Sequence, residues 1–354
     1  MKAVVQVKRV RRAVAAAAAL TALLTVAACS SGGSTGSTAS SQGSGVTKVT
    51  VAEEFTSTLN SALYLAQKEG FFAKQGLDVN FVAVPNGNTL ASLLGGSAQL
   101  AVESGVFPVT ALAQDQKFTV FAATGNGFSE GVIVNSSSYA KSGLTASSTF
   151  DQRIRALAGK PLGVLTPTGE NTTVFKYLFH LAGVPLSELK TVSLGTPTAI
   201  VSALKAGTIF AAAIGAPYPQ IAESAGYAKL LYNLSAGDVK QMTDTLTLGM
   251  VATPSYYASN PSVIKRFTTA LQQGQDYVYA HPAASADYIA STYFAGSPKS
   301  AVVAALDDQL KGGAIAHSTT ISPESVQRLI TFMGATGQKV GSDWKSIFPD
   351  LSKS

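Results

Sequence analysis

The sequence predicts an α/β protein built from two lobes of similar construction. Three observations support this prediction. Short β-branched runs alternate with helical runs up to about residue 260, the chain then becomes mostly helical, and one helix–strand–loop pattern occurs once in each half. An apolar content of 46% against 13% charged residues is typical of a large folded core and argues against disorder.

The elements of the first half are predicted from apolar periodicity and from the glycines that end the helical runs. Residues 61–75 have helical spacing and stop at Gly76, and residues 88–94 stop at Gly95-Gly96. We expect strands at 47–51, 77–84, 100–102, 119–123 and 131–134.

The second half opens a new strand–helix unit and then changes character. We expect strands at 161–165, 191–194 and 209–214, with helices at 171–182 and 198–206. After about Asn260 the expected elements are all helical, at 261–280, 283–294, 299–311 and 323–336.

A weak internal repeat suggests that the two lobes share one construction. Residues 93–108 and residues 204–219 both read as the end of a helix, a glycine, a short apolar strand and a Gly-containing loop that ends in aromatic-Pro. We expect residues 47–134 and 246–354 to form the first lobe and residues 135–245 the second. The two crossings, near 134–136 and 245–248, would form a hinge.

The first 28 residues have the three regions of a secretory signal peptide. A basic start is followed by an apolar run at 13–26 and by small residues before Cys29, the chain's only cysteine. The apolar run is too short and too alanine-rich to predict a transmembrane helix. The ending Ala27-Ala28-Cys29 resembles the bacterial lipobox, which implies a lipid on Cys29 and a location at the outer face of the cytoplasmic membrane. An ordinary signal peptide with a chance cysteine is the alternative.

The charge of the chain does not indicate a nucleic-acid partner. The formal net charge is +6, but five of the 26 Lys and Arg residues precede Cys29 and no Asp or Glu does, which leaves 21 basic against 20 acidic residues. A nucleic-acid binder needs a basic patch, and no Lys/Arg run remains. Residues 29–46 are expected to be the lipidated cysteine and a flexible Ser/Gly linker.

The sequence lacks the residue sets that metal, cofactor or catalytic sites require. Its three histidines, His180, His281 and His317, are far apart and show no metal-ligand spacing. No Gly-rich loop with a following Lys-Ser/Thr could hold a phosphate. We therefore expect a non-enzymatic protein that binds neither metal nor cofactor.

Four segments in chain order resemble the solute-binding proteins of ABC importers, in the family that includes nitrate-, sulfonate-, taurine- and thiamine-pyrimidine-binding members. The segments are E-G-F-F-A-K-Q-G-L-D-V (69–79), L-A-G-K-P-L-G-V (157–164), L-A-G-V-P-L-S-E-L (181–189) and Y-Y-A-S-N-P-S-V (256–263). The resemblance implies a type II periplasmic-binding-protein fold that closes around a small organic ligand and delivers it to a permease and an ATPase. Gln99 and Phe210 stand where the family often has Asp, so ligand contacts cannot be transferred directly.

Two other functions are compatible with the same fold. One is an enzyme similar to the fungal synthases of the thiamine pyrimidine, but their cysteine-rich motif is absent and an export signal suits a receptor better. The other is a receptor that signals to a membrane protein without transport.

The candidate ligand site comprises four loops that follow strands, because ligands of α/β sheets bind beyond the carboxyl ends of strands. In chain order these loops are residues 53–58, 103–106, 166–172 and 215–218. The resemblance places the same loops in the cleft, two from each lobe. The expected ligand-binding residues are Glu54, Phe55, Thr56, Ser104, Gly105, Thr168, Gly169, Glu170, Asn171, Thr172 and Tyr218.

The residue types in these loops leave two ligand classes open. The third loop opens a helix at Asn171, whose N-terminus could hold a sulfonate or carboxylate. However, no Arg or Lys lies in any of the four loops, and Glu54, Glu103 and Glu170 do. This charge favours a nitrogenous or heteroaromatic ligand, on which Phe55, Phe107 or Tyr218 could stack.

Overall fold

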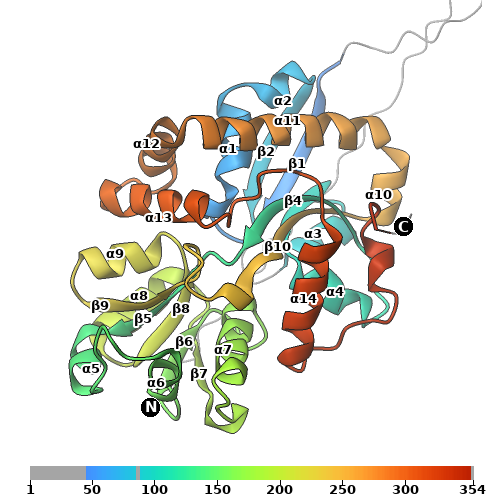
Figure 1. The fold of residues 1–354 in the computed structure, drawn as a ribbon. Coiled ribbons are helices and arrows are strands. Elements are labelled where there is room, and N and C mark those ends of the chain that lie inside the picture. Colours follow the sequence, from blue (N-terminus) through green and yellow to red (C-terminus); the bar gives the residue numbers. More distant parts are fainter. Residues whose placement is uncertain (1–44, 85–87, 352–354) are drawn as a thin grey trace, which may run out of the picture. The chain divides into compact units, whose positions relative to one another are not determined.

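The computed structural model describes residues 45–84 and 88–351. The expected signal peptide (1–28), Cys29 and nearly all of the expected linker lie outside the described residues. In the part that is described, strands and helices alternate as expected and form two five-stranded sheets (Figure 1).

The first sheet has the strand order β2-β1-β3-β10-β4. β1, β2 and β3 are parallel, and β10 lies antiparallel between β3 and β4 although it is far from both in sequence (Figure 1). The strands are β1 (Thr47–Glu53), β2 (Leu77–Ala83), β3 (Leu100–Ser104), β4 (Thr119–Gly127) and β10 (Thr243–Ala252).

The second sheet repeats this arrangement with the order β7-β6-β8-β5-β9. β6, β7 and β8 are parallel, and β5 is antiparallel to both β8 and β9. The strands are β5 (Glu130–Asn135), β6 (Pro161–Val164), β7 (Lys190–Ser193), β8 (Ala211–Gly215) and β9 (Ala228–Asn233).

We call each sheet with the helices packed on it a lobe. The first lobe contains η1 (Thr58–Asn60), α1 (Ser61–Lys68), α2 (Phe71–Lys74), α3 (Thr89–Leu94), α4 (Val106–Leu112), α10 (Pro254–Ser259), α11 (Pro261–Ala280), α12 (Pro282–Tyr293), α13 (Lys299–Lys311), α14 (Pro323–Ala335) and η4 (Trp344–Ile347). The second contains α5 (Ser136–Lys141), α6 (Phe150–Arg155), α7 (Glu170–Leu181), η2 (Leu186–Glu188), α8 (Pro197–Ala206), α9 (Tyr218–Ser224) and η3 (Lys240–Met242).

The core follows from the alternation of side chains along the strands. In β1, Val49 and Val51 pack into a cluster with α1, α11 and α12, whereas Ala52 faces a second cluster with α4 and α14. Both faces of the first sheet are therefore covered, and all five residues of the inner strand β3 are buried.

The internal repeat corresponds to equivalent positions in the two sheets. Its strands are β3 and β8, the third strand in the order of each sheet, and the loop after each leads into α4 or α9. The expected helix at 61–75 is two helices, because Gly70 has a φ of 71° between α1 and α2.

The chain changes sheets earlier than the sequence indicated. β4 ends at Gly127 and β5, which begins at Glu130, already belongs to the second sheet, so the expected crossing near 134–136 lies one strand too late. The return occurs between the end of β9 at Asn233 and the start of β10 at Thr243, ahead of the expected 245–248. Among the described helices, none is long and apolar enough to span a membrane.

Candidate functional site

A cavity of about 80 Å³ lies between the loops that follow the strands of the two lobes. This volume accommodates several water molecules or a small solute. The first lobe contributes Glu54, Phe55, Ser57, Leu59, Asn60, Val102, Glu103, Ser104, Phe107, Thr247 and Leu248, and the second contributes Ser129, Glu130, Leu165, Thr166, Gly169, Glu170, Asn171 and Gly215.

Six of the eleven expected ligand-binding residues line this cavity. They come from three of the four predicted loops: Glu54, Phe55, Ser104, Gly169, Glu170 and Asn171. Phe55 also packs against the apolar cluster of the second lobe, so its ring contacts both lobes.

The other five expected residues are not part of the cavity lining, and the structure explains three of them. Thr172 donates its hydroxyl hydrogen to the Thr166 carbonyl, with 2.7 Å between the oxygens. Gly105 is packed so closely that a Cβ there would lie 2.7 Å from the Leu246 carbonyl oxygen. Tyr218 packs against the apolar cluster around α8. Thr56 and Thr168 also lie outside the lining.

Four polar lining residues lie outside the four predicted loops, and only the fold brings them in. Asn60 belongs to the 3-10 turn after the first loop, Ser129 and Glu130 to the crossing between the sheets, and Thr247 to β10. Ser129 directly precedes β5, and Glu130 is its first residue. Only the position of β5 in the second sheet places them in the cleft.

Four glutamates dominate the electrostatics of the cavity: Glu54, Glu103, Glu130 and Glu170. Burial, partly opposed by the hydrogen bond from Thr89 and assisted by the nearby charge of Glu54, raises the pKa of Glu103 to about 7. Burial likewise raises the pKa of Glu130 to about 7. The pKa of Glu170 lies well above its ordinary value because of burial and then because of Glu130, while the Ser104 hydroxyl partly opposes the shift.

The structure provides little compensation for this negative charge. Of the lining residues that the structure describes, none is Lys or Arg. Glu103 accepts hydrogen bonds from the amide of the adjacent Ser104 at 2.8 Å and from the hydroxyl of Thr89 on α3. The helix α7 begins at Glu170, so a carboxyl group already occupies the helix end at which we considered an anion. The geometry therefore disfavours the sulfonate or carboxylate alternative.

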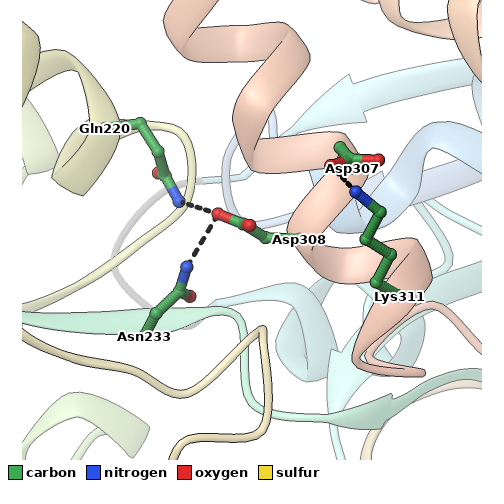
Figure 2. Close-up of polar contacts among 5 residues, drawn as sticks. All are labelled: Gln220, Asn233, Asp307, Asp308 and Lys311. Atoms are coloured by element: carbon green, nitrogen blue, oxygen red, sulfur yellow. Dashed lines mark hydrogen bonds and ion pairs between the residues drawn. The ribbon is translucent and has the colours of Figure 1, made fainter.

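The two lobes are also joined next to the crossing by the carboxylate of Asp308 on α13. Asp308 Oδ2 accepts hydrogen bonds from Gln220 Nε2 on α9 at 3.1 Å and from Asn233 Nδ2 at the end of β9 at 2.7 Å (Figure 2). The neighbouring Asp307 instead pairs with Lys311 on its own helix at 2.5 Å (Figure 2). Asp308 thus connects the lobes and Asp307 does not.

Comparison with known families identifies the chain. The sequence model of the family described as NMT1/THI5 like matches residues 58–285, which is more than half of the chain. This chain belongs to the NMT1/THI5-like family. Proteins of Brucella abortus and Brucella suis that carry a provisional binding-protein description are 25% identical over 228 residues, which cover 64% of this chain and 65% of their own length.

Solved structures show the same fold. The alkanesulfonate-binding protein SsuA of Xanthomonas axonopodis, bound to MOPS, aligns with a TM-score of 0.67 at 16% identity and covers 86% of this chain and 98% of its own. The nitrate-binding protein NrtA of Synechocystis aligns with a TM-score of 0.67 at 16% identity and covers 87% of this chain and 86% of its own. This NMT1/THI5-like chain therefore has the periplasmic-binding-protein fold, as the sequence predicted.

Within the described residues of this family member, no group of three or more His, Cys, Asp or Glu side chains is arranged to hold a metal ion.

Proposed function

We propose that this chain is the solute-binding component of an ABC import system and that it binds a small organic solute in the cavity between its lobes. The observation that carries the proposal is the cavity lining, in which polar side chains of both lobes surround one site. A solute there contacts both lobes only when they are close together, so it favours the closed form. Membership of the NMT1/THI5-like family supports the same function.

The solute is nitrogenous, in contrast to the oxyanions named for the two solved relatives. When they are ionised, the four glutamates of the lining would repel a sulfonate or nitrate, and none of the described lining residues is a Lys or Arg that could offset them. Oxyanion sites instead use Arg or Lys, with Arg providing bidentate hydrogen bonds. Phe55 and Phe107 line the same cavity and offer faces for a cation or a planar ring.

A lipid on Cys29 would keep this receptor beside its permease and ATPase at the outer face of the membrane. The support is the sequence alone: a signal-peptide pattern that ends in Ala27-Ala28-Cys29, followed by a Ser/Gly-rich stretch. The anchor and the binding site are then separate functions, located at different ends of the linker.

One experiment tests the anchor and the receptor separately. In the native host, Cys29→Ser is expected to release the protein into the medium, because the thiol that carries the lipid is lost. Native mass spectrometry of the released protein should still show one small solute per chain. Retention of Cys29→Ser on the cell would contradict the anchor, and a bare chain mass from cells actively importing solutes would contradict the receptor.

A further inference from the structure

Two buried oxygen atoms in the cavity have no hydrogen-bond donor. They are Oδ1 of Asn60, in the first lobe, and Oε2 of Glu130, in the second. Asn60 and Glu130 are each only 4% exposed. Buried polar atoms are nearly always paired, so two unpaired acceptors that line one cavity require an explanation.

The orientation of the Asn60 amide is fixed by its neighbours. Glu53 Oε2 accepts hydrogen bonds from Asn60 Nδ2 at 2.9 Å and from the Tyr64 hydroxyl at 2.6 Å. The amide nitrogen must therefore face Glu53, and the amide oxygen must face away from it. Asn60 thus presents its amide oxygen, an acceptor, to the cavity.

The carboxylate of Glu130 is held in a similar way. Its Oε1 atom accepts a hydrogen bond from Asn171 Nδ2 at 3.3 Å, which leaves Oε2 without a partner. Asn171, which the sequence suggested as a ligand contact, thus positions Glu130. Each unpaired acceptor is held in place by its own lobe: Asn60 by Glu53 in the first lobe, and Glu130 by Asn171 in the second. One molecule that donates hydrogen bonds to both acceptors would therefore connect the lobes.

The charge around these acceptors specifies the donor further. Glu54, Glu103 and Glu170 line the same cavity, and a water molecule could donate to either oxygen without neutralising any of them. The raised pKa values of Glu103 and Glu130 reflect this uncompensated burial. A cation that carries N–H groups satisfies both the acceptors and the charge.

We propose that the solute is an organic cation with at least two N–H donors, such as a guanidinium, amidinium or primary ammonium group, which bridges Asn60 Oδ1 and Glu130 Oε2. This proposal rests on the proposed receptor function and names the class of its ligand. Such a bridge would couple ligand binding to closure, because the ligand can donate hydrogen bonds to both lobes only when the lobes are together.

Three small probes with the same number of non-hydrogen atoms separate charge from hydrogen bonding. Methylguanidinium has charge and N–H donors, tetramethylammonium has charge alone, and methanesulfonate is an anion. In calorimetry with solute-free protein we expect methylguanidinium to bind at least about tenfold more tightly than tetramethylammonium, since the loss of hydrogen bonds to a charged group costs over 1 kcal/mol. We expect no binding of methanesulfonate.

Glu130→Gln tests the carboxylate, and Glu188→Gln, a change of an exposed glutamate in the same lobe, is the matched control. Glu130→Gln should weaken methylguanidinium binding by about tenfold or more, and Glu188→Gln should not change it. Circular dichroism verifies that each variant is folded, and the wild-type probe series does not depend on either variant.

The possible outcomes separate this proposal from the receptor function. Equal binding of the two cations would overturn the donor requirement, and absence of methylguanidinium binding would overturn the ligand class. If methanesulfonate binds, and Glu130→Gln strengthens its binding, the proposed ligand class is wrong but the proposed receptor function stands. If no probe binds and the protein carries no solute from its host, the proposed function fails as well.

Discussion

Replacing Gly274 with alanine is expected to lower the free energy of unfolding by about 2 kcal/mol. Gly274 is a buried residue of α11, at its contact with α1. A Cβ there would overlap the Ala62 carbonyl oxygen and lie 2.9 Å from the Ala66 Cβ. Alanine favours a helix by up to about 1 kcal/mol over glycine, but separating two packed helices costs more than this gain.

Gly334→Ala is the matched control for this prediction. Gly334 is an exposed residue of α14, and a Cβ there would have no atom within 4 Å. This substitution should therefore raise the free energy of unfolding, by up to about 1 kcal/mol. Thermal melting of the two variants should shift in opposite directions, and a Gly274→Ala protein as stable as the wild type would show that α1 and α11 are not so closely packed.

The solute-free protein is expected to lose stability as the pH rises from about 5 to 8. Burial raises the pKa of Glu103 and Glu130 from 4.5 to about 7, so the folded protein holds their protons more tightly than the unfolded chain. This contribution is fully present below the unfolded pKa and is lost as the pH rises through the folded pKa. A pKa difference of this size between the folded and unfolded states corresponds to about 3 kcal/mol in the free energy of unfolding for one group. The contribution per group is smaller when both groups titrate together.

Melting temperatures measured across this pH range would test the effect. The double variant Glu103→Gln and Glu130→Gln should reduce the pH dependence, because neither amide titrates, although Glu170, whose pKa is also raised, still contributes. A solute that is a cation should raise the wild-type melting temperature most at pH 8, where the carboxylates need a counter-charge. A double variant with the wild-type slope would contradict the role of these two glutamates.

The sequence was sufficient to predict the alternating elements, because their signals are local. Gly76 and Gly96, both at positive φ, follow the helical runs they were expected to end. The sheet that a strand joins is not a local property. The apolar residues of β5, 132–134, resemble those of any buried strand, and its assignment to the second sheet depends on pairing with β8 and β9. The strands β9 and β10 were missed for the same reason, since β9 pairs with β5 and β10 pairs between β3 and β4.

The candidate site was partly predictable for the same physical reason. Residues directly after a strand, such as Glu54 and Ser104, could be placed at the cleft from chain order alone. Whether a side chain is free to face the cavity depends on its neighbours. Thr172 had a suitable position, but its hydroxyl is bonded to Thr166. Glu130 had no marker in the sequence and became visible only once β5 was placed.

Small-angle scattering of the purified protein tests the central claim, that a solute binds between the lobes and holds them together. Saturating solute should reduce the radius of gyration of the wild type. Asp308→Ala removes the acceptor shared by Gln220 and Asn233. Without solute, this variant should be more expanded than the wild type, and its affinity for the solute should be about fivefold lower. Asp307→Ala, the control, should resemble the wild type. A radius that does not change when a bound solute saturates the wild type would contradict closure around the ligand.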